Sequence, residues 1–303
     1  MNSQNAASTI ETLESASERK RKPRPVSLAE NTPVAEAFGI LAGSISVEAV
    51  RRARALRAKA DPEVLHKLRV ALRRMRSLYW AFEPLLDRKD YRAQREKFRY
   101  LAYAAGKTRD WDVLRDMLLA AISTHELTGS LLQAVDEQRA AALAFSRTTI
   151  RNAGIEEMLQ SACVSAQQHL ELFAPASTLA DLAGARVEVA EKALKKRIKR
   201  AIRSGHGDYA ALHDVRIAGK RLRYLLEFFL PVLDSSHSEK IRRLSEVQEV
   251  LGKVNDLVVS ETLLRQYSIQ LGDSGVTEQA VAFLGARKIQ YMNDAHAMLC
   301  NLK

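Results

Sequence analysis

The chain has 303 residues, of which 47% are apolar and 27% are charged, and its formal net charge at pH 7 is +11. This length supports a sizeable core in one large or two smaller domains, and no apolar run approaches the roughly 18 to 20 residues that a membrane span needs. The positive charge indicates a polyanionic partner: nucleic acid, an anionic membrane or polymeric phosphate.

The composition of residues 1–30 predicts a disordered tail with a basic end. The segment is rich in Ser, Glu and Asn, contains RKRKPRP and lacks the apolar stretch of a secretory signal. A plain solvated linker is favoured over a tail that helps to hold a polyanion. Cys163 and Cys300 lie far apart without the spacing of metal ligands, which predicts two reduced thiols in a cytoplasmic protein.

From Pro33 onward the sequence has helical periodicity, and no segment shows the alternation of a strand. Asp61 and Pro62 are suited to cap and open a helix, and Pro84 is suited to stop it. In chain order, helices are expected over residues 34–60, 62–83, 90–122, 127–151, 155–173, 178–203, 208–230, 237–270 and 275–302. The predicted fold class is all-α.

The sequence contains an internal repeat. When the chain is shifted by 147 residues, nine of the 21 positions 66–86 are identical, which indicates a duplicated unit. AGKTRD (105–110) also matches LGKVND (251–256) at a shift of 146. A repeat of this length is a whole helical bundle. Two pseudo-symmetric bundles are therefore predicted, over residues 31–175 and 176–302, with a boundary near Pro175.

The repeated segments are amphipathic and basic. HKLRVALRRMR (66–76) and HDVRIAGKRLR (213–223) each place a row of cations opposite an apolar face. The helix before each row is also basic, and chain reversals would bring each basic pair side by side, so that the two pairs face each other across a groove or pore. Arginine offers forked donors to phosphate oxygens and lysine offers a point charge, so a long, multiply charged anion suits this arrangement.

Alternative interpretations apply to several of these residues. The cationic rows can be solvated helix faces, although two matching copies disfavour this. His66 and His213 can be metal ligands, but Arg surrounds them where a second ligand would be needed. Asp110 and Asp256 either orient basic residues or merely pair within the bundle, and the second is slightly favoured. Gly106 and Gly252 are expected to allow close helix packing.

The four segments HKLRVALRRMR, HDVRIAGKRLRY, GKTRDWDVL and GKVNDLVV, in this order, resemble the CHAD domain family, the conserved histidine α-helical domain. The resemblance covers about residues 30 to 300. It implies two four-helix bundles related by pseudo-symmetry and a central basic cavity that holds inorganic polyphosphate. Two departures, Asn255 where the first half has Arg109 and the acidic Asp214 beside the second row, indicate that the halves bind unequally.

The resemblance assigns the polyphosphate-binding role to particular residues. The motif set is His66, Arg69, Arg73, Arg74, Arg76, His213, Arg216, Lys220, Arg221 and Arg223. Basic residues of the preceding helices follow less securely: Arg51, Arg57, Lys195, Lys196 and Lys199. Some family members add a triphosphate-processing domain with a Glu-x-Glu-x-Lys signature, which EVAEK (188–192) does not match.

The expected function is non-enzymatic polyphosphate binding in the cytoplasm, without a cofactor or metal ion; storage-granule targeting, phosphate sensing and enzyme recruitment stay open as its use. The alternatives are nucleic-acid binding, disfavoured because only 6% of the residues are aromatic, and phosphate-cleaving catalysis, disfavoured because clustered carboxylates are lacking. The sequence names no protein partner and indicates no membrane association.

Overall fold

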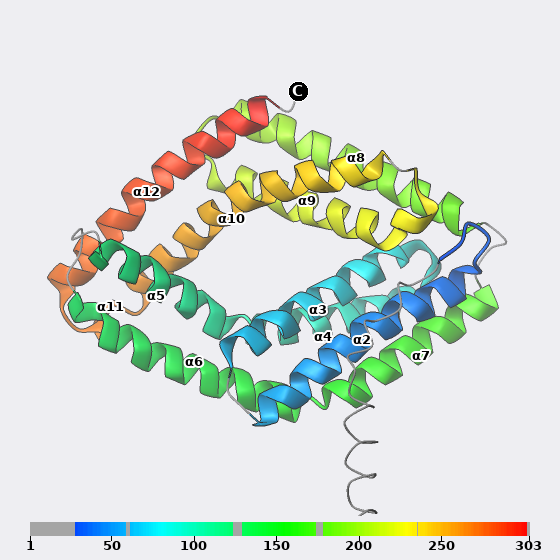
Figure 1. Ribbon diagram of the computed structural model, residues 1–303, viewed down its shortest axis with the longest axis horizontal. Coiled ribbons are helices and arrows are strands. Elements are labelled where there is room, and N and C mark those ends of the chain that lie inside the picture. Colours follow the sequence, from blue (N-terminus) through cyan, green and yellow to red (C-terminus); the bar gives the residue numbers. More distant parts are fainter. Residues whose placement is uncertain (1–27, 59–60, 124–128, 174–177, 235, 302–303) are drawn as a thin grey trace, which may run out of the picture.

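The computed structural model describes residues 28–58, 61–123, 129–173, 178–234 and 236–301, and in these ranges it contains helices and no strand (Figure 1). The all-α prediction is confirmed. Residues 1–27 of the predicted tail and the predicted boundary at Pro175 lie outside the described ranges. No helix in the described part of the chain is long and apolar enough to cross a bilayer.

The helices follow one another with short connections. The first half contains α2 (Val34–Ala58), α3 (Pro62–Ala81), α4 (Arg88–Ala104), α5 (Lys107–Ser123), α6 (Leu132–Asn152) and α7 (Ile155–Phe173). The second half contains α8 (Leu179–Ser204), α9 (Tyr209–Phe229), α10 (His237–Gln266), α11 (Ser268–Leu271) and α12 (Ser274–Cys300). Short 3-10 turns lie at Glu83–Leu85, Gly129–Leu131 and Leu230–Val232.

The two repeated helices, α3 and α9, begin and end at residues of the expected types. The Asp61 side chain accepts a hydrogen bond from the backbone N–H of Glu63, and Pro62 is the first residue of α3. At the start of α9 the Asp208 side chain accepts from the N–H of Ala211. Each helix then runs into a 3-10 turn that contains a proline, so the two helices begin and end alike.

One expected helix is divided. Residues 90–122 form α4 and α5, with a break at Ala105 and Gly106, whereas the matching segment of the second half is continuous in α10 and passes straight through Gly252. The last turn expected before residue 270 is the separate short helix α11.

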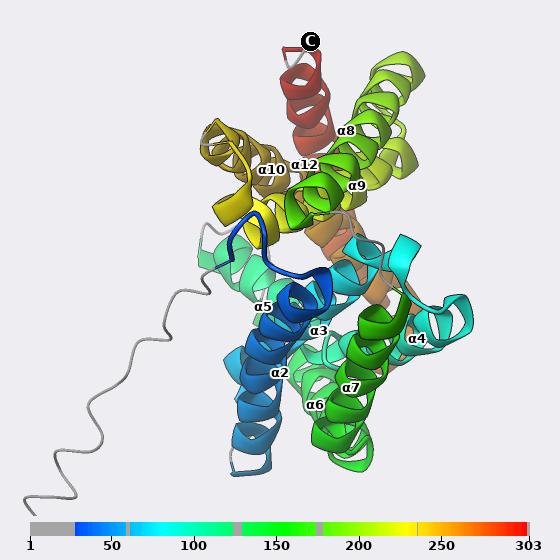
Figure 2. The ribbon, with the colours of Figure 1, turned by 90° about the vertical axis from the view of Figure 1, so that its right-hand side faces the viewer.

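The same packing partners occur in both halves. Helix α2 packs on α3 as α8 packs on α9, and α3 contacts α4 as α9 contacts α10. Figure 2 shows α8 to α10 and α12 lying above α2, α3, α4 and α7. The duplication of a four-helix bundle stays a prediction, because recurring contacts alone do not establish it.

The apolar core is not divided between residues 31–175 and 176–302. One cluster of buried side chains joins α2, α3, α4 and α7 to α8, α9 and parts of α10 and α12, with Phe38, Tyr79 and Phe98 in edge-to-face contacts. A second cluster joins α5 and α6 to α10, α11 and α12 around Trp111 and Leu264. The halves are therefore held together at both ends, by α3 against α9 and by α5 against α10.

Candidate anion-binding site

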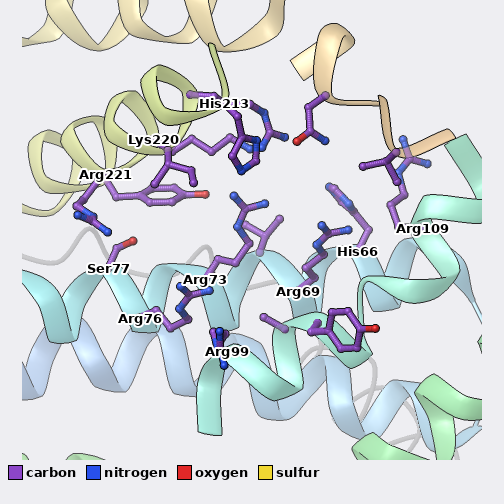
Figure 3. Close-up of a pocket in the computed structure, with 18 of the residues that line it drawn as sticks. His66, Arg69, Arg73, Arg76, Ser77, Arg99, Arg109, His213, Lys220 and Arg221 are labelled. Carbon is purple, nitrogen blue, oxygen red and sulfur yellow. The ribbon is translucent and has the colours of Figure 1, made fainter. Parts of the chain in front are cut away.

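A cavity of about 510 Å³ lies between the two halves and is lined by α3, α4, α5, α9 and α10 (Figure 3). Its charged lining residues are Arg69, Arg73, Arg76, Arg95, Arg99, Arg109, Asp110, Arg216, Lys220, Arg221 and Asp256, with His66 and His213 beside them. Nine lysine or arginine side chains thus face two aspartates. A cavity with this balance concentrates positive potential and favours an anion with several charges.

The amphipathic character of α3 and α9 directs these side chains inward. In α3, Leu65, Leu68, Leu72 and Met75 are fully buried in the core, and the opposite face carries the cationic row. In α9 the buried face is formed by Val215, Leu222, Leu225 and Leu226. The two rows therefore meet across the cavity, as the labelled side chains show (Figure 3).

Three basic side chains that line the cavity have no partner in the described residues. Among the described residues, no hydrogen bond or ion pair is formed by Arg73, Arg216 or Lys220. Burial, together with the charges of Arg69 and Arg216, lowers the pKa of Arg73 to about 10. Burial and the neighbouring Arg73 and Arg216 lower the pKa of Lys220 to about 6. In the free protein these groups therefore disfavour one another's charged forms, and Lys220 is largely uncharged at pH 7; a bound anion would favour the charged forms.

Arg69 is held from the side of α5. Its guanidinium donates to Asp110 Oδ1 at 3.2 Å and to the carbonyl oxygen of Gly106 at 3.5 Å. Burial raises the pKa of Asp110, and the charge of Arg69 opposes that rise. A side chain at Gly106 would meet the Arg69 guanidinium at 2.9 Å, whereas nothing lies within 4 Å of the same position on Gly252. The expectation of close helix packing at these glycines is wrong: Gly106 makes room for Arg69, and Gly252 has open space.

These two glycines give a matched pair of substitutions. Gly106→Ala is expected to push the Arg69 guanidinium away from Asp110 and to lower polyanion affinity severalfold, because the guanidinium is the flexible group that must move. Gly252→Ala is expected to leave affinity unchanged and to stabilise the helix by roughly 0.5–1 kcal/mol. Binding titrations and thermal unfolding of both variants check this, and equal affinities for the two would contradict it.

The two histidines also line the cavity. Burial and the charge of Arg109 lower the pKa of His66, and burial and Arg216 lower that of His213. His66 Nδ1 is buried without a hydrogen-bond partner, while His213 Nδ1 lies 3.3 Å from the Tyr209 hydroxyl. Within the described residues, no group of three or more His, Cys, Asp or Glu side chains is placed to hold a metal ion. Both imidazoles can donate a hydrogen bond to an anion.

Two of the predicted arginines lie outside the cavity. Glu227 accepts from Arg74 at 3.1 Å and from Arg223 at 2.7 Å, and Arg223 also donates to the Gln248 side chain. The counterparts of these arginines behave differently. Arg76 faces the cavity, and Arg221 lies there with its guanidinium 4.8 Å from the centre of the Trp80 ring.

The cations of the preceding helices do not reach the cavity either. Arg51 pairs with Glu48, Arg57 borders a separate hollow between α2 and α6, and Lys195, Lys196 and Lys199 are exposed on α8. The expectation that these helices face the shared groove is not met, because α2 and α8 pack behind α3 and α9 and turn their basic faces to solvent. Whether these residues contact an anion stays a prediction.

Helix α4 contributes residues that the sequence analysis missed. Arg95, Arg99 and Tyr103 line the cavity, and their spacing of four residues places them on one helix face. This spacing was the available signal. The repeat did not reveal it, because the positions that match Arg95 and Arg99 at a shift of 146 are Ile241 and Ser245. Arg109 and Asn255 both line the cavity, so its two sides carry different charge.

The family model described as "CHAD domain" matches residues 46–265. A CHAD domain crystal structure from the plant Ricinus communis is 26% identical, with a TM-score of 0.78, and the match covers 93% of this chain and 96% of that chain. PptA from Streptomyces chartreusis has the same fold at 18% identity and a TM-score of 0.66, covering 89% and 99% of the two chains. The comparison with curated proteins gives no match.

Proposed function

Because this chain belongs to the CHAD domain family, we propose that its central cavity binds inorganic polyphosphate and does not alter it chemically. The observation that carries the proposal is the group of half-buried basic side chains without partners in the described residues, Arg73, Arg216 and Lys220. A structural role would require carboxylates to pair with them, since unpaired buried charge destabilises a fold. A row of phosphates supplies the missing negative charge.

Arginine geometry favours phosphate over a single small anion. The lining offers several guanidinium groups whose forked donors each fit two phosphate oxygens, and they are distributed along α3, α4, α5 and α9 instead of converging on one point. From His66 to Arg76 the row on α3 is about 15 Å long. A linear polyanion can contact such a row at several places at once.

The carboxylates of the lining support binding over catalysis. Metal-assisted phosphoryl transfer places carboxylates where they can hold a divalent ion next to the phosphates. Of the two aspartates in the cavity, Asp110 is engaged by Arg69. The proposal therefore assigns no catalytic residue.

A titration with polyphosphates of graded length tests the proposal. Affinity is expected to increase with chain length until the contacts are filled, and the logarithm of the association constant should fall linearly with the logarithm of salt concentration. Phosphate release is expected to stay at background with magnesium or manganese present. Absence of binding at low salt would overturn the proposal. Displacement of polyphosphate by DNA or RNA at equal charge concentration would favour nucleic acid as the ligand.

A further inference from the structure

Helix α8 carries a row of cations that is separate from the cavity. We call it the outer stripe, and it consists of Lys192, Lys195, Lys196, Lys199, Arg200 and Arg203. The face of α8 that packs into the core is formed by Ala183, Ala190, Leu194 and Ala201. On a helical wheel the stripe is centred on the opposite side. It therefore faces solvent over about 16 Å of helix.

Most of the outer stripe is not neutralised. Lys192 pairs with Glu188, and Arg200 lies 3.7 Å from Asp214. Among the described residues, the other four members form no hydrogen bond or ion pair, and all four are exposed. Like charges three and four positions apart on a helix repel one another. An anion lying along the row would remove this repulsion.

A half-buried arginine connects the stripe with the cavity. Arg197, next to Lys196 on α8, is close enough to Arg221 to contribute to the lowered pKa of that cavity residue. Arg186 of α8 and Arg221 also lie against the same Trp80 ring. The Arg186 guanidinium is 4.2 Å from the ring centre. Cations thus follow one another from the cavity, past Arg221 and Arg197, to the outer face of α8.

We propose that the outer stripe is a second polyphosphate contact, which holds the part of a long chain that extends beyond the cavity. The inference rests on the function proposed above and adds a dependence on chain length. Short chains fill the cavity alone, and long chains contact both surfaces.

The composition of α8 favours a bare phosphate polymer over other polyanions. The helix contains no aromatic residue, so the bases of a nucleic acid would have nothing to stack on. A helix that binds a membrane surface inserts an apolar face, and the apolar face of α8 is buried in the core. The outer stripe can therefore recognise a polyanion only through its row of positive charges.

The test neutralises the four unpaired cations in the full chain, as Lys195→Gln, Lys196→Gln, Lys199→Gln and Arg203→Gln together. The matched control changes four exposed cations of α4 by the same charge: Arg88→Gln, Lys89→Gln, Arg92→Gln and Lys97→Gln. Both variants and the wild type are titrated with tripolyphosphate and with polyphosphate of several tens of units, at two salt concentrations. Binding to duplex DNA and to anionic phospholipid vesicles is measured in parallel.

The stripe variant is expected to bind long polyphosphate roughly tenfold or more weakly than the α4 control, with a shallower salt dependence. Its affinity for tripolyphosphate should equal that of the α4 control, because both variants lose the same net charge. Equal long-chain affinities in the two variants would overturn the inference, as would a loss confined to DNA or vesicles. Failure of the wild type to bind either polyphosphate would instead overturn the proposed function.

Discussion

Replacing Arg69 and Arg216 together by glutamine is expected to weaken polyphosphate binding by at least about a hundredfold, because each loses a charge-assisted contact on one side of the cavity. The free energy of unfolding should change by no more than about 1 kcal/mol. Glutamine at position 69 can still donate to Asp110, and loss of the partnerless charge of Arg216 relieves repulsion. Isothermal titration and chemical unfolding measure the two effects separately.

The control for this double variant is Arg88→Gln with Arg92→Gln, which removes the same charge from exposed positions on α4. Its affinity should fall only slightly, through the change in net charge. If the Arg69 and Arg216 variant lost helicity in proportion to its loss of binding, the two arginines would have a structural role and the assignment would be incorrect.

Lys220→Met is expected to stabilise the free protein at pH 7 by an amount on the order of a few kcal/mol. The pKa of Lys220 is lowered from 10.5 to about 6 in the folded state. Between these values the unfolded chain binds more protons than the folded chain, so the wild type loses stability as the pH falls from about 10 to about 6. Below about pH 6 this group adds no further dependence. The methionine variant should lose this slope, which unfolding curves at several pH values reveal.

The same lysine should make binding depend on pH. A bound polyanion raises the pKa of Lys220, so binding above about pH 6 takes up a proton and affinity decreases as the pH rises. Titrations in buffers of different ionisation enthalpy count the protons taken up. Lys220→Met should bind more weakly than the wild type at pH 6 and take up fewer protons. Identical proton uptake by both proteins would contradict the assignment.

The features that the sequence predicts correctly are those that the local spacing of residues along a helix determines. Asp61 and Pro62 identify the start of α3, and the alternation of Leu68 and Leu72 with Arg69 and Arg73 determines which side chains enter the core and which face the cavity. These assignments hold because helix geometry fixes the direction of each side chain once one face is buried.

The features that the sequence did not predict, the direction of Arg74 and the break before α5, depend on tertiary contacts. Arg74 lies about 80° from His66 on a helical wheel, between the two faces, so its direction depends on Glu227, a neighbour that is distant in sequence. The break before α5 occurs in AGKTRD but not in the matching LGKVND of α10. What distinguishes the two sites in space is the Arg69 guanidinium against Gly106, a contact that no local pattern encodes.

Trp80 and Glu227 occupy equivalent positions, 147 residues apart, and each receives an arginine from the opposite repeat: Arg221 and Arg74, respectively. The outcomes differ. A carboxylate cancels the charge of its arginine, whereas an indole only stacks against the guanidinium and leaves its N–H groups and charge free. The two equivalent positions therefore leave the charge of Arg221 available to the cavity and neutralise the charge of Arg74 outside it.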